Sequence, residues 1–435
     1  MFFICFSACE RSKYQNSIIS SAHPLASKSG KKMYELGGNA FDAAVSAAFT
    51  LSVVEPSMSG LGGRLQAIFV SNGKIGGVDA STEVPLSYKP TKEKFEHGYK
   101  TIGIPGVVAG LIKLHEENGS LPLEIVMAPA IDHAKNGFKM LPGEAYRQKL
   151  ASKIYKQYDG TSFHFLKEDK TNYEKGETFI QESLSKVLIK ISKEGKKGFY
   201  EGEIAKKIVS DIQINGGIIT LNDLKNYQAL DSRILEGKYE NHNLYSLFLP
   251  SFGAITIKIL QILDNLQTAK TEEEWVLNIG SATKLAYQSR DYQINEDSLK
   301  NILSYDRAKK IARKLINKKI ISNNNLLDQP KSWIADIGHT THLTTADKKG
   351  NIVSLTQTIG PLMGSKVASK GLGFVYAVTL GGYLGNYKPG DRANSHISPT
   401  LIFKDNSPVL ALGAAGGSRI ITAITQVTSR YLGQK

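Results

Sequence analysis

Residues 340–358 read Thr340-Thr-His-Leu-Thr-Thr-Ala-Asp-Lys-Lys-Gly-Asn-Ile-Val-Ser-Leu-Thr-Gln-Thr358. Two runs rich in Thr, Val and Leu flank a Lys-Lys-Gly turn, a pattern that predicts two antiparallel strands joined as a hairpin. Gly350 supplies the left-handed residue that a three-residue hairpin loop needs, so Asp347 and Asn351 should close the loop. Counting outward from that pair places Thr340 directly opposite Thr358, within hydrogen-bonding reach.

The hairpin alone leaves two alternatives open. A two-residue loop would shift the register by one position and make the contact between Thr340 and Thr358 diagonal. Threonine is also common in strands, so the two residues can be read as ordinary β-formers paired on a sheet.

The composition is that of a globular protein. Of the 435 residues, 41% are hydrophobic and 22% are charged, which is an ordinary balance for a folded chain. The formal charge of +14 would suit nucleic acid or an anionic membrane if it were concentrated on one face, but the lysines are spread along the chain and no nucleic-acid-binding motif accompanies them. The densest run, at 309–319, has Ile and Leu at helical spacing, which favours the solvated face of an amphipathic helix over a binding patch.

Both cysteines, Cys5 and Cys9, stand in the first nine residues, so the body of the chain has no thiol for catalysis. His339 and His342 have no acidic neighbours at metal-ligand spacing, and we expect neither a metal nor another cofactor.

Residues 1–15 resemble the end of a signal peptide with a lipobox, which predicts a periplasmic or extracellular protein with a lipid anchor at Cys9. A mis-assigned start codon is the alternative. No other stretch is long and apolar enough to cross a membrane.

Helical patterns come first along the chain and strand patterns last. A short helix should end at Gly37-Gly38, and a second helix, at 40–53, is apolar enough to be buried on all sides. A hairpin follows at 65–78. Residues 103–327 are mainly helical in pattern, and the last hundred residues alternate as strands do. This order predicts a layered α/β fold with sheets flanked by helices.

Further motifs accompany the hairpin in order along the chain. They are Gly37-Gly38-Asn39-Ala40, Asp42-Ala43-Ala44-Val45, Val54-Glu55-Pro56, Ser59-Gly60-Leu61-Gly62-Gly63, Ile104-Pro105-Gly106, Asn215-Gly216-Gly217, Asp223-Leu224, Gly338-His339-Thr340-Thr341-His342, Ser398-Pro399-Thr400 and Gly416-Gly417-Ser418-Arg419. Each motif is a weak signal, but together they cover nearly the whole chain. The sequence resembles the γ-glutamyltransferase family of N-terminal-nucleophile hydrolases. That resemblance implies an αββα sandwich with a large, mainly helical region.

The resemblance also implies that the chain cuts itself between His339 and Thr340. The large piece would be 16–339, and the small piece, 340–435, would carry the nucleophile. Family members continue through further strands, so the small piece is expected to be incomplete. The two pieces should remain associated.

The resemblance implies the chemistry as well. The freed Thr340 would attack an amide, with its own α-amino group as the base and Thr358 as a hydroxyl partner. Gly416 and Gly417 would form the oxyanion hole. The implied substrates are small amides or peptides such as glutathione, with water or an amine as the acceptor.

Several positions depart from the family at the glutamyl-binding site. Thr82 stands where the family has an arginine that holds the α-carboxylate. Thr379 and Gly382 stand where a glutamine and an aspartate hold the α-amino group. His396, beside Ser395, replaces one of two serines.

The remaining candidates are weaker. Gly360 replaces an asparagine of the family, and Ser418 is a candidate for substrate contact within the double-glycine motif. Asp79 and Glu83 are expected to be surface charges rather than a catalytic pair. The sequence therefore supports an amide hydrolase of altered specificity, with a degenerate member that acts as a binding protein as the alternative.

Overall fold

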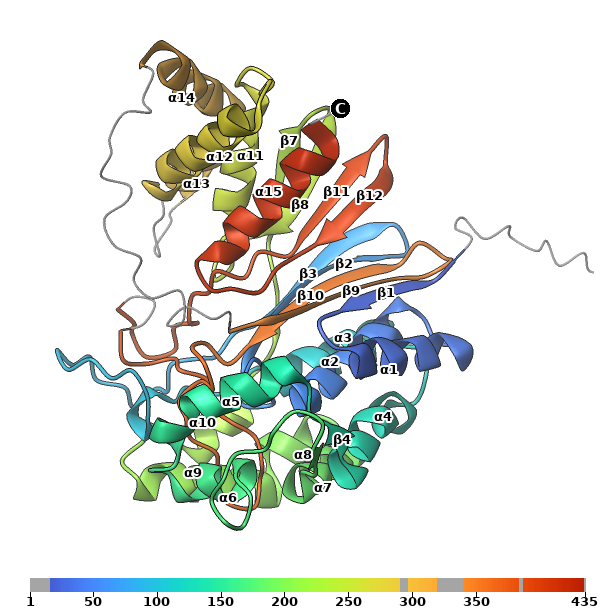
Figure 1. Cartoon of the computed structure of the whole chain (residues 1–435), viewed down its shortest axis with the longest axis vertical. Coiled ribbons are helices and arrows are strands. Elements are labelled where there is room, and N and C mark those ends of the chain that lie inside the picture. The colour runs from blue at the N-terminus through green and yellow to red at the C-terminus, as the bar shows by residue number, and fades with distance from the viewer. Residues whose placement is uncertain (1–15, 290–295, 319–338, 383–385, 434–435) are drawn as a thin grey trace, which may run out of the picture.

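The computed structural model describes residues 16–289, 296–318, 339–382 and 386–433. The expected signal segment with Cys9 lies outside these residues, so the localisation remains a prediction. Two antiparallel sheets face each other at the centre, and helices cover both outer sides (Figure 1). This is the αββα sandwich expected from the sequence.

Within the described residues, the first sheet has six strands, in the order β1 (Ile18–Ser21), β9 (Thr341–Ala346), β10 (Ile352–Thr358), β2 (Arg64–Ser71), β3 (Lys74–Ala80) and β6 (Leu230–Asp231). The second has four, in the order β12 (Ser407–Leu412), β11 (Thr400–Lys404), β8 (His242–Leu247) and β7 (Ile234–Tyr239). Apolar side chains of the two sheets, among them Ile68, Ile352 and Leu401, form the core between them. A separate ribbon joins β4 (Phe138–Lys139) to β5 (Thr178–Phe179).

The strand order interleaves the parts of the chain before and after position 339. In the first sheet, β9 and β10 lie between β1 and β2. In the second sheet, β11 pairs with β8. Each sheet is therefore built from both parts.

Helices of the N-terminal region cover the first sheet and extend away from it (Figure 1). They are α1 (Pro24–Glu35), α2 (Ala40–Val54), α3 (Val107–Asn118), α4 (Leu123–Asn136), α5 (Pro142–Tyr155), α6 (Asp159–Phe165), α7 (Glu182–Glu194), α8 (Lys197–Tyr200), α9 (Gly202–Ile214) and α10 (Leu221–Asn226), with a 3₁₀ turn at Tyr99–Thr101. The helices over the second sheet are α11 (Gly253–Asp264), α12 (Glu272–Tyr287), α13 (Glu296–Leu303), α14 (Tyr305–Lys318) and α15 (Arg419–Gly433).

Helix α2 lies against the first sheet, and every one of its residues is buried, as its composition predicts. The Asn39 side chain accepts from backbone N–H groups of the first turn, while the Asp42 side chain accepts from the Asn39 N–H. This capping box fixes where the helix starts. The preceding helix ends as predicted, because Gly37 has a φ of 86° and the Gly38 N–H donates to the Met33 carbonyl.

Two elements differ from the sequence prediction. The mainly helical region contains the hairpin β7–β8, and the last hundred residues end in helix α15. The Ile, Thr and Val residues of α15 favour a strand by propensity. Packing decides otherwise, because Ile420 and Ile424, about one turn apart, are both buried against the second sheet.

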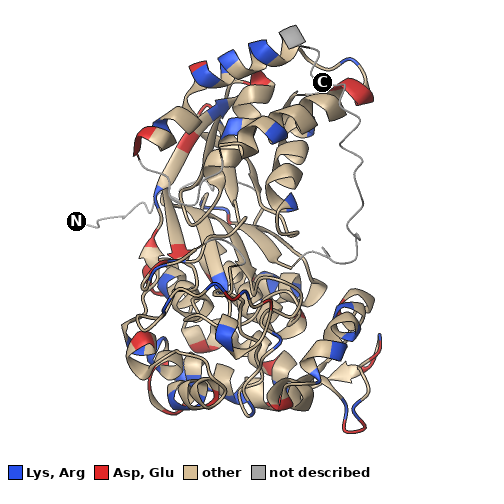
Figure 2. Ribbon diagram, turned by 90° about the vertical axis from the view of Figure 1, so that its left-hand side faces the viewer, with Lys and Arg blue, Asp and Glu red and all other residues tan. Residues whose placement is uncertain are grey.

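The charge is distributed as expected. Figure 2 shows Lys and Arg spread over both ends of the molecule among Asp and Glu. The dense lysine run falls on α14, where Ala308 and Ala312 are buried while Lys309 and Lys310 are exposed. Its described part is therefore the amphipathic helix predicted. In the part of the chain that the structure describes, no helix has the length and hydropathy needed to cross a membrane.

Candidate active site

The hairpin β9–β10 has the predicted register. The backbone N–H of Asp347 donates to the Asn351 carbonyl at 3.0 Å, and Gly350 has a φ of 89°. The loop therefore has three residues, and the alternative two-residue loop is excluded. Continuing the strand pairing outward brings Thr340 opposite Thr358.

Three hydrogen bonds meet at Thr358 Oγ1, beside the peptide bond between His339 and Thr340. The Thr340 hydroxyl donates to Thr358 Oγ1 at 3.1 Å, and the Thr358 hydroxyl donates to the His339 carbonyl oxygen. The backbone N–H of Gly360 donates to Thr358 Oγ1 at 3.0 Å. Both threonines are only 3% exposed. Thr358 thus bridges the hydroxyl of Thr340 and the carbonyl group that precedes it.

The neighbours of the two threonines are held by buried contacts. The hydroxyl of Thr341 donates to Glu55 Oε2 at 2.8 Å. A Cβ at Gly63 would stand 2.5 Å from the carbonyl oxygen of Thr358, so only glycine fits at this position without a shift of the backbone. This close approach accounts for one glycine of the Gly-rich loop noted in the sequence.

Glu55 belongs to a buried polar cluster between α2 and α5. Arg147 donates to Glu144 Oε2 at 2.9 Å and lies 3.8 Å from Glu55 Oε1. Ser57 also donates to Glu144, at 2.6 Å. Burial raises the pKa of Glu55, and the charge of Glu144 adds to the rise, whereas the Thr341 hydrogen bond and Arg147 oppose it. The strand that directly follows Thr340 is therefore tied to a carboxyl group whose ionisation is costly.

Most of the predicted site residues meet at one small cavity of about 20 Å³, which is room for about one water molecule. The cavity is lined by Arg64, His339, Thr340, Thr358, Gly360, Ser395, His396, Gly417 and Ile420. His396 stacks on Phe252 with the ring centroids 5.7 Å apart. Residues from the hairpin, from β2 and from the segments before β11 and α15 thus converge on the bond between His339 and Thr340.

Gly416 and Gly417 form the turn that precedes α15. Their φ values are 132° and 58°, in the region that favours glycine. Gly417 lies at the cavity, and Gly416 directly precedes it. Two consecutive backbone N–H groups at the start of a helix suit the oxyanion role that the family resemblance assigns to them.

Thr82 and Ser418, which we expected to contact substrate, do not line this cavity in the described structure. The Thr82 hydroxyl instead accepts a hydrogen bond from Thr379 at 2.8 Å, and the two residues are 0% and 2% exposed. The Ser418 carbonyl accepts from the Tyr287 hydroxyl at 2.8 Å. Both are held by partners from distant segments, which the sequence could not reveal.

Arg64, the first residue of β2, is the site residue that sequence reasoning missed. It is 1% exposed and stands opposite Thr358 in the sheet. Its guanidinium donates to the Asn394 carbonyl at 3.1 Å and to the Val378 carbonyl. The available signal was a charged residue between a glycine-rich loop and an apolar strand.

His342 lies in β9, two residues after Thr340. Its Nδ1 is 2.8 Å from Thr356 Oγ1 and its Nε2 is 3.0 Å from Thr344 Oγ1. Burial lowers the pKa of His342 to about 3, so the ring is neutral. A Cβ at Gly413 would stand 2.4 Å from this ring. His342 is therefore a packed strand histidine.

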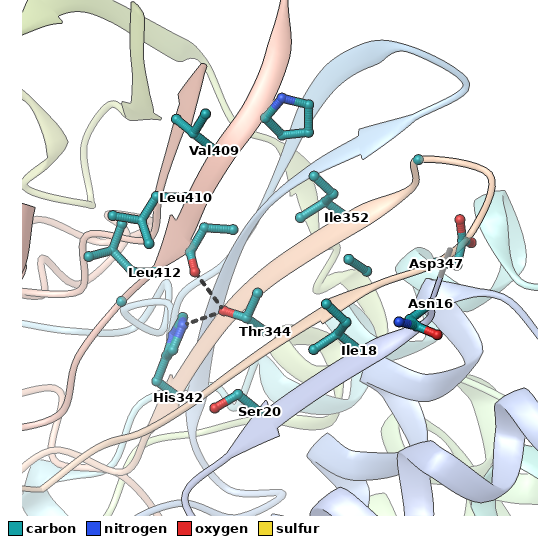
Figure 3. Close-up of a pocket in the computed structure, with 15 residues that line it drawn as sticks. Asn16, Ile18, Ser20, His342, Thr344, Asp347, Ile352, Val409, Leu410 and Leu412 are labelled. Atoms are coloured by element: carbon teal, nitrogen blue, oxygen red, sulfur yellow. Dashed lines mark hydrogen bonds between the residues drawn. The ribbon is translucent and has the colours of Figure 1, made fainter. Parts of the chain in front are cut away.

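Beyond His342, a separate cavity of about 840 Å³ opens between β1, β9, β10 and β12 (Figure 3). Its wall is largely apolar, with Ile18, Ile352, Leu410 and Leu412 pointing into it. Thr340 and Thr358 are not among the residues that line this larger cavity in the described structure.

Other charged groups are held in structural contacts. The expectation of surface charge is wrong for Asp79, which is 6% exposed and lies 3.5 Å from Arg392. Glu83 lies 3.5 Å from the same guanidinium. No group of His, Cys, Asp and Glu is arranged to hold a metal ion in the described part of the chain.

Residues 26–435 match the model of the family described as Gamma-glutamyltranspeptidase. The chain belongs to the γ-glutamyltranspeptidase family. The Capsule biosynthesis protein CapD proenzyme of Bacillus anthracis is 30% identical to it over 420 residues, or 95% of this chain and 75% of that protein. The Glutathione hydrolase proenzyme of Bacillus subtilis (strain 168) is 30% identical over 462 residues, covering 95% and 77%.

The fold of this γ-glutamyltranspeptidase family member is similar to that of cephalosporin acylase from Bacillus halodurans. The two structures superpose with a TM-score of 0.83 at 22% sequence identity, over 100% of this chain and 84% of the acylase chain. Family membership makes the protein an enzyme of the class that hydrolyses amides or transfers acyl groups.

Proposed function

We propose that this family member cuts its own chain between His339 and Thr340 and then uses Thr340 to cleave or transfer the acyl group of a γ-glutamyl-type amide. The observation that carries the proposal is the bridge formed by Thr358 between the Thr340 hydroxyl and the His339 carbonyl oxygen. The proenzyme names of its relatives support self-processing, and the name glutathione hydrolase supports the substrate type.

Self-cleavage begins when Thr340 Oγ1 attacks the carbonyl carbon of His339. The Thr340 proton passes to Thr358, and the proton of Thr358 passes to the carbonyl oxygen as negative charge develops there. The C–N bond then breaks, and the departing nitrogen takes up the proton that the oxygen releases, which leaves an ester between His339 and Thr340. Water hydrolyses the ester to a carboxylate at His339 and a free hydroxyl and amine at Thr340.

The freed α-amino group then serves as the base in turnover. Its pKa in peptides is about 8, so a large share is neutral near physiological pH. It accepts the Thr340 hydroxyl proton during attack on the substrate carbonyl and returns that proton to the leaving amine. The N–H groups of Gly416 and Gly417 stabilise the developing oxyanion. Water or an amine then takes the acyl group from Thr340.

The specificity we propose differs from that of the family. Thr82, Thr379 and Gly382 occupy the positions of the arginine, glutamine and aspartate that hold the glutamyl head group in the family. Here Thr82 and Thr379 bond to each other in a buried pair. Losing an arginine contact to the carboxylate and an aspartate contact to the ammonium costs about 3 to 6 kcal/mol, or about two to four powers of ten in binding. Glutathione and other γ-glutamyl amides should therefore be poor substrates compared with acyl groups that lack the α-amino acid head.

The mass of the purified protein under denaturing conditions tests self-cleavage. We expect two pieces, one ending at His339 and the other starting at Thr340. Thr340→Ala should yield a single uncut chain, while Thr340→Ser, which keeps a hydroxyl, should still cut, more slowly. A wild-type chain that stays whole after long incubation would contradict the proposal and favour the alternative of a non-catalytic binding protein.

A further inference from the structure

Lys366 is a buried residue that the proposed mechanism does not use. It is 7% exposed and stands in the loop at 360–366, which begins two residues after Thr358. Its amine donates to the carbonyl oxygen of Gly364 at 3.1 Å and to that of Leu362. Both acceptors belong to the same loop. Because hydrogen bonds from a charged donor are among the strong ones, these two bonds fix how the loop is folded.

The 360–366 loop needs this support because its backbone is strained. Met363 and Lys366 have φ values of 55° and 64°, in the left-handed region that residues with a Cβ rarely adopt. Gly360 and Gly364 lie in the same region, at 88° and 48°. Strained residues of this kind persist only where the surrounding contacts over-determine the backbone, and they are concentrated at functional sites. The conformation of this loop is therefore one that its contacts must impose.

The loop reaches the bond that is cut through its first residue. The backbone N–H of Gly360 donates to Thr358 Oγ1 at 3.0 Å. The same oxygen accepts from Thr340, and its hydroxyl donates to the carbonyl oxygen of His339. Gly360 thus limits the directions in which the Thr358 hydroxyl can point. If the loop relaxed from its left-handed conformation, this N–H would move and the Thr358 bridge would lose its orientation.

We propose that Lys366 is a positioning residue for self-cleavage, because its amine holds the 360–366 loop in the conformation that presents the Gly360 N–H to Thr358. This inference rests on the proposed function of Thr340. Lys366 is not among the described residues that line the small cavity at Thr340. It therefore acts through Gly360 and Thr358 and does not touch the reacting atoms.

Lys258 is the matched control for Lys366. It is also buried, at 2% exposure, and burial lowers the pKa of both amines to about 8. Lys258 stands on α11, over the second sheet, and donates to the hydroxyl of Ser289. Removing either amine takes a buried donor from the fold, but the Lys258 amine does not bond to the loop that follows Thr358.

The rate of self-cleavage, measured from masses over time after refolding, tests the inference. Lys366→Met should cut about 10-fold more slowly than wild type, the effect of one lost hydrogen bond, while Lys258→Met should stay within about two-fold. Lys366→Arg keeps a charged donor and should cut faster than Lys366→Met. Lys366→Gly adopts the left-handed conformation without strain, so it should fold even if Lys366→Met does not. Because it lacks the amine, it should also cut more slowly than wild type.

Coupling to Thr358 separates positioning from a general loss of stability. In a Thr358→Val background the hydroxyl that Gly360 orients is absent, so Lys366→Met should slow self-cleavage no further. A substitution that only weakens the fold would slow both backgrounds by the same factor. Equal factors would therefore overturn the role of Lys366.

The remaining outcomes keep the two proposals apart. A wild type that does not cut itself refutes the proposed function and, with it, this inference. A wild type that cuts itself while Lys366→Met or Lys366→Gly cuts at the same rate overturns the role of Lys366 alone. An equal loss in Lys258→Met, or a Lys366→Arg variant no faster than Lys366→Met, overturns it as well.

Discussion

Thr358 is the residue through which the geometry of the site is most directly tested. It accepts from Thr340 and Gly360 and donates to the carbonyl oxygen of His339. Thr358→Val keeps the β-branched shape, so the hairpin should form while the bridge is lost. We expect self-cleavage to slow about 100-fold, as when a donor to a developing oxyanion is removed. The rate is measured from masses over time after refolding.

Thr356→Val is the matched control for this prediction. Thr356 lies on the same face of β10, but its hydroxyl contacts His342 instead of the bond that is cut. Its cleavage rate should stay within a few-fold of wild type. Equal rates in Thr358→Val and wild type would refute the role of the bridge, and equal losses in both variants would assign the effect to folding.

Sequence analysis identified the site residues whose contacts are with residues close by in the chain. The pairing of Thr340 with Thr358 follows from a loop of three residues, and the structure confirms that register. Arg64 escaped notice because its acceptors, Val378 and Asn394, are more than three hundred positions away. A charged residue at the start of an apolar strand does not indicate which distant carbonyl groups will accept its hydrogen bonds.

Glu55, the residue that directly follows helix α2, is joined to strand β9 by a hydrogen bond from the Thr341 hydroxyl. Thr341→Val removes the donor and leaves the carboxyl group buried, which should cost about 1.5 to 3 kcal/mol of unfolding free energy when Glu55 is ionised. Denaturant titration measures this loss. It should be accompanied by slower self-cleavage, because the strand beside Thr340 loses its anchor.

The unfolding free energy lost in Thr341→Val should increase as pH rises. Burial raises the pKa of Glu55, so its carboxylate destabilises the folded state more as pH rises through that raised pKa. The Thr341 hydrogen bond opposes this rise in the pKa of Glu55 because it stabilises the carboxylate. Removing the bond therefore costs more unfolding free energy at high pH, where Glu55 is ionised, than at low pH. In a Glu55→Gln background the cost of Thr341→Val should be independent of pH. A cost that is the same at every pH with Glu55 present would contradict this account.

At the scale of elements, prediction succeeded where the composition and capping residues of a single segment specify its structure. The composition of α2 and its cap at Asn39 specify a helix buried on all sides, and the structure agrees. Helix α15 was read as a strand because β-branched residues are frequent in it, and burial of Ile420 and Ile424 overrides that preference. The hairpin β7–β8 was missed because its partner, β11, lies about 155 residues further along the chain.

The whole molecule is organised so that the proposed cut falls between strands that share a sheet. Strands β9 and β10 follow the cut and pair with β1 and β2, which precede it. In the second sheet, β11, which follows the cut, pairs with β8, which precedes it. The division into 16–339 and 340–435 is thus a division of the chain, while the core between the sheets belongs to both pieces.

This topology predicts that the two pieces remain together after self-cleavage. Separation would break the strand pairs on both sides of β9–β10 and expose the apolar core between the sheets, a cost that one broken peptide bond does not offset. On size-exclusion chromatography in native buffer, wild type should elute as one species at the volume of uncut Thr340→Ala. In denaturant it should resolve into two. Release of the small piece in native buffer would show that the interleaved strands do not hold the pieces together, and the topology described here would then be wrong for the processed protein.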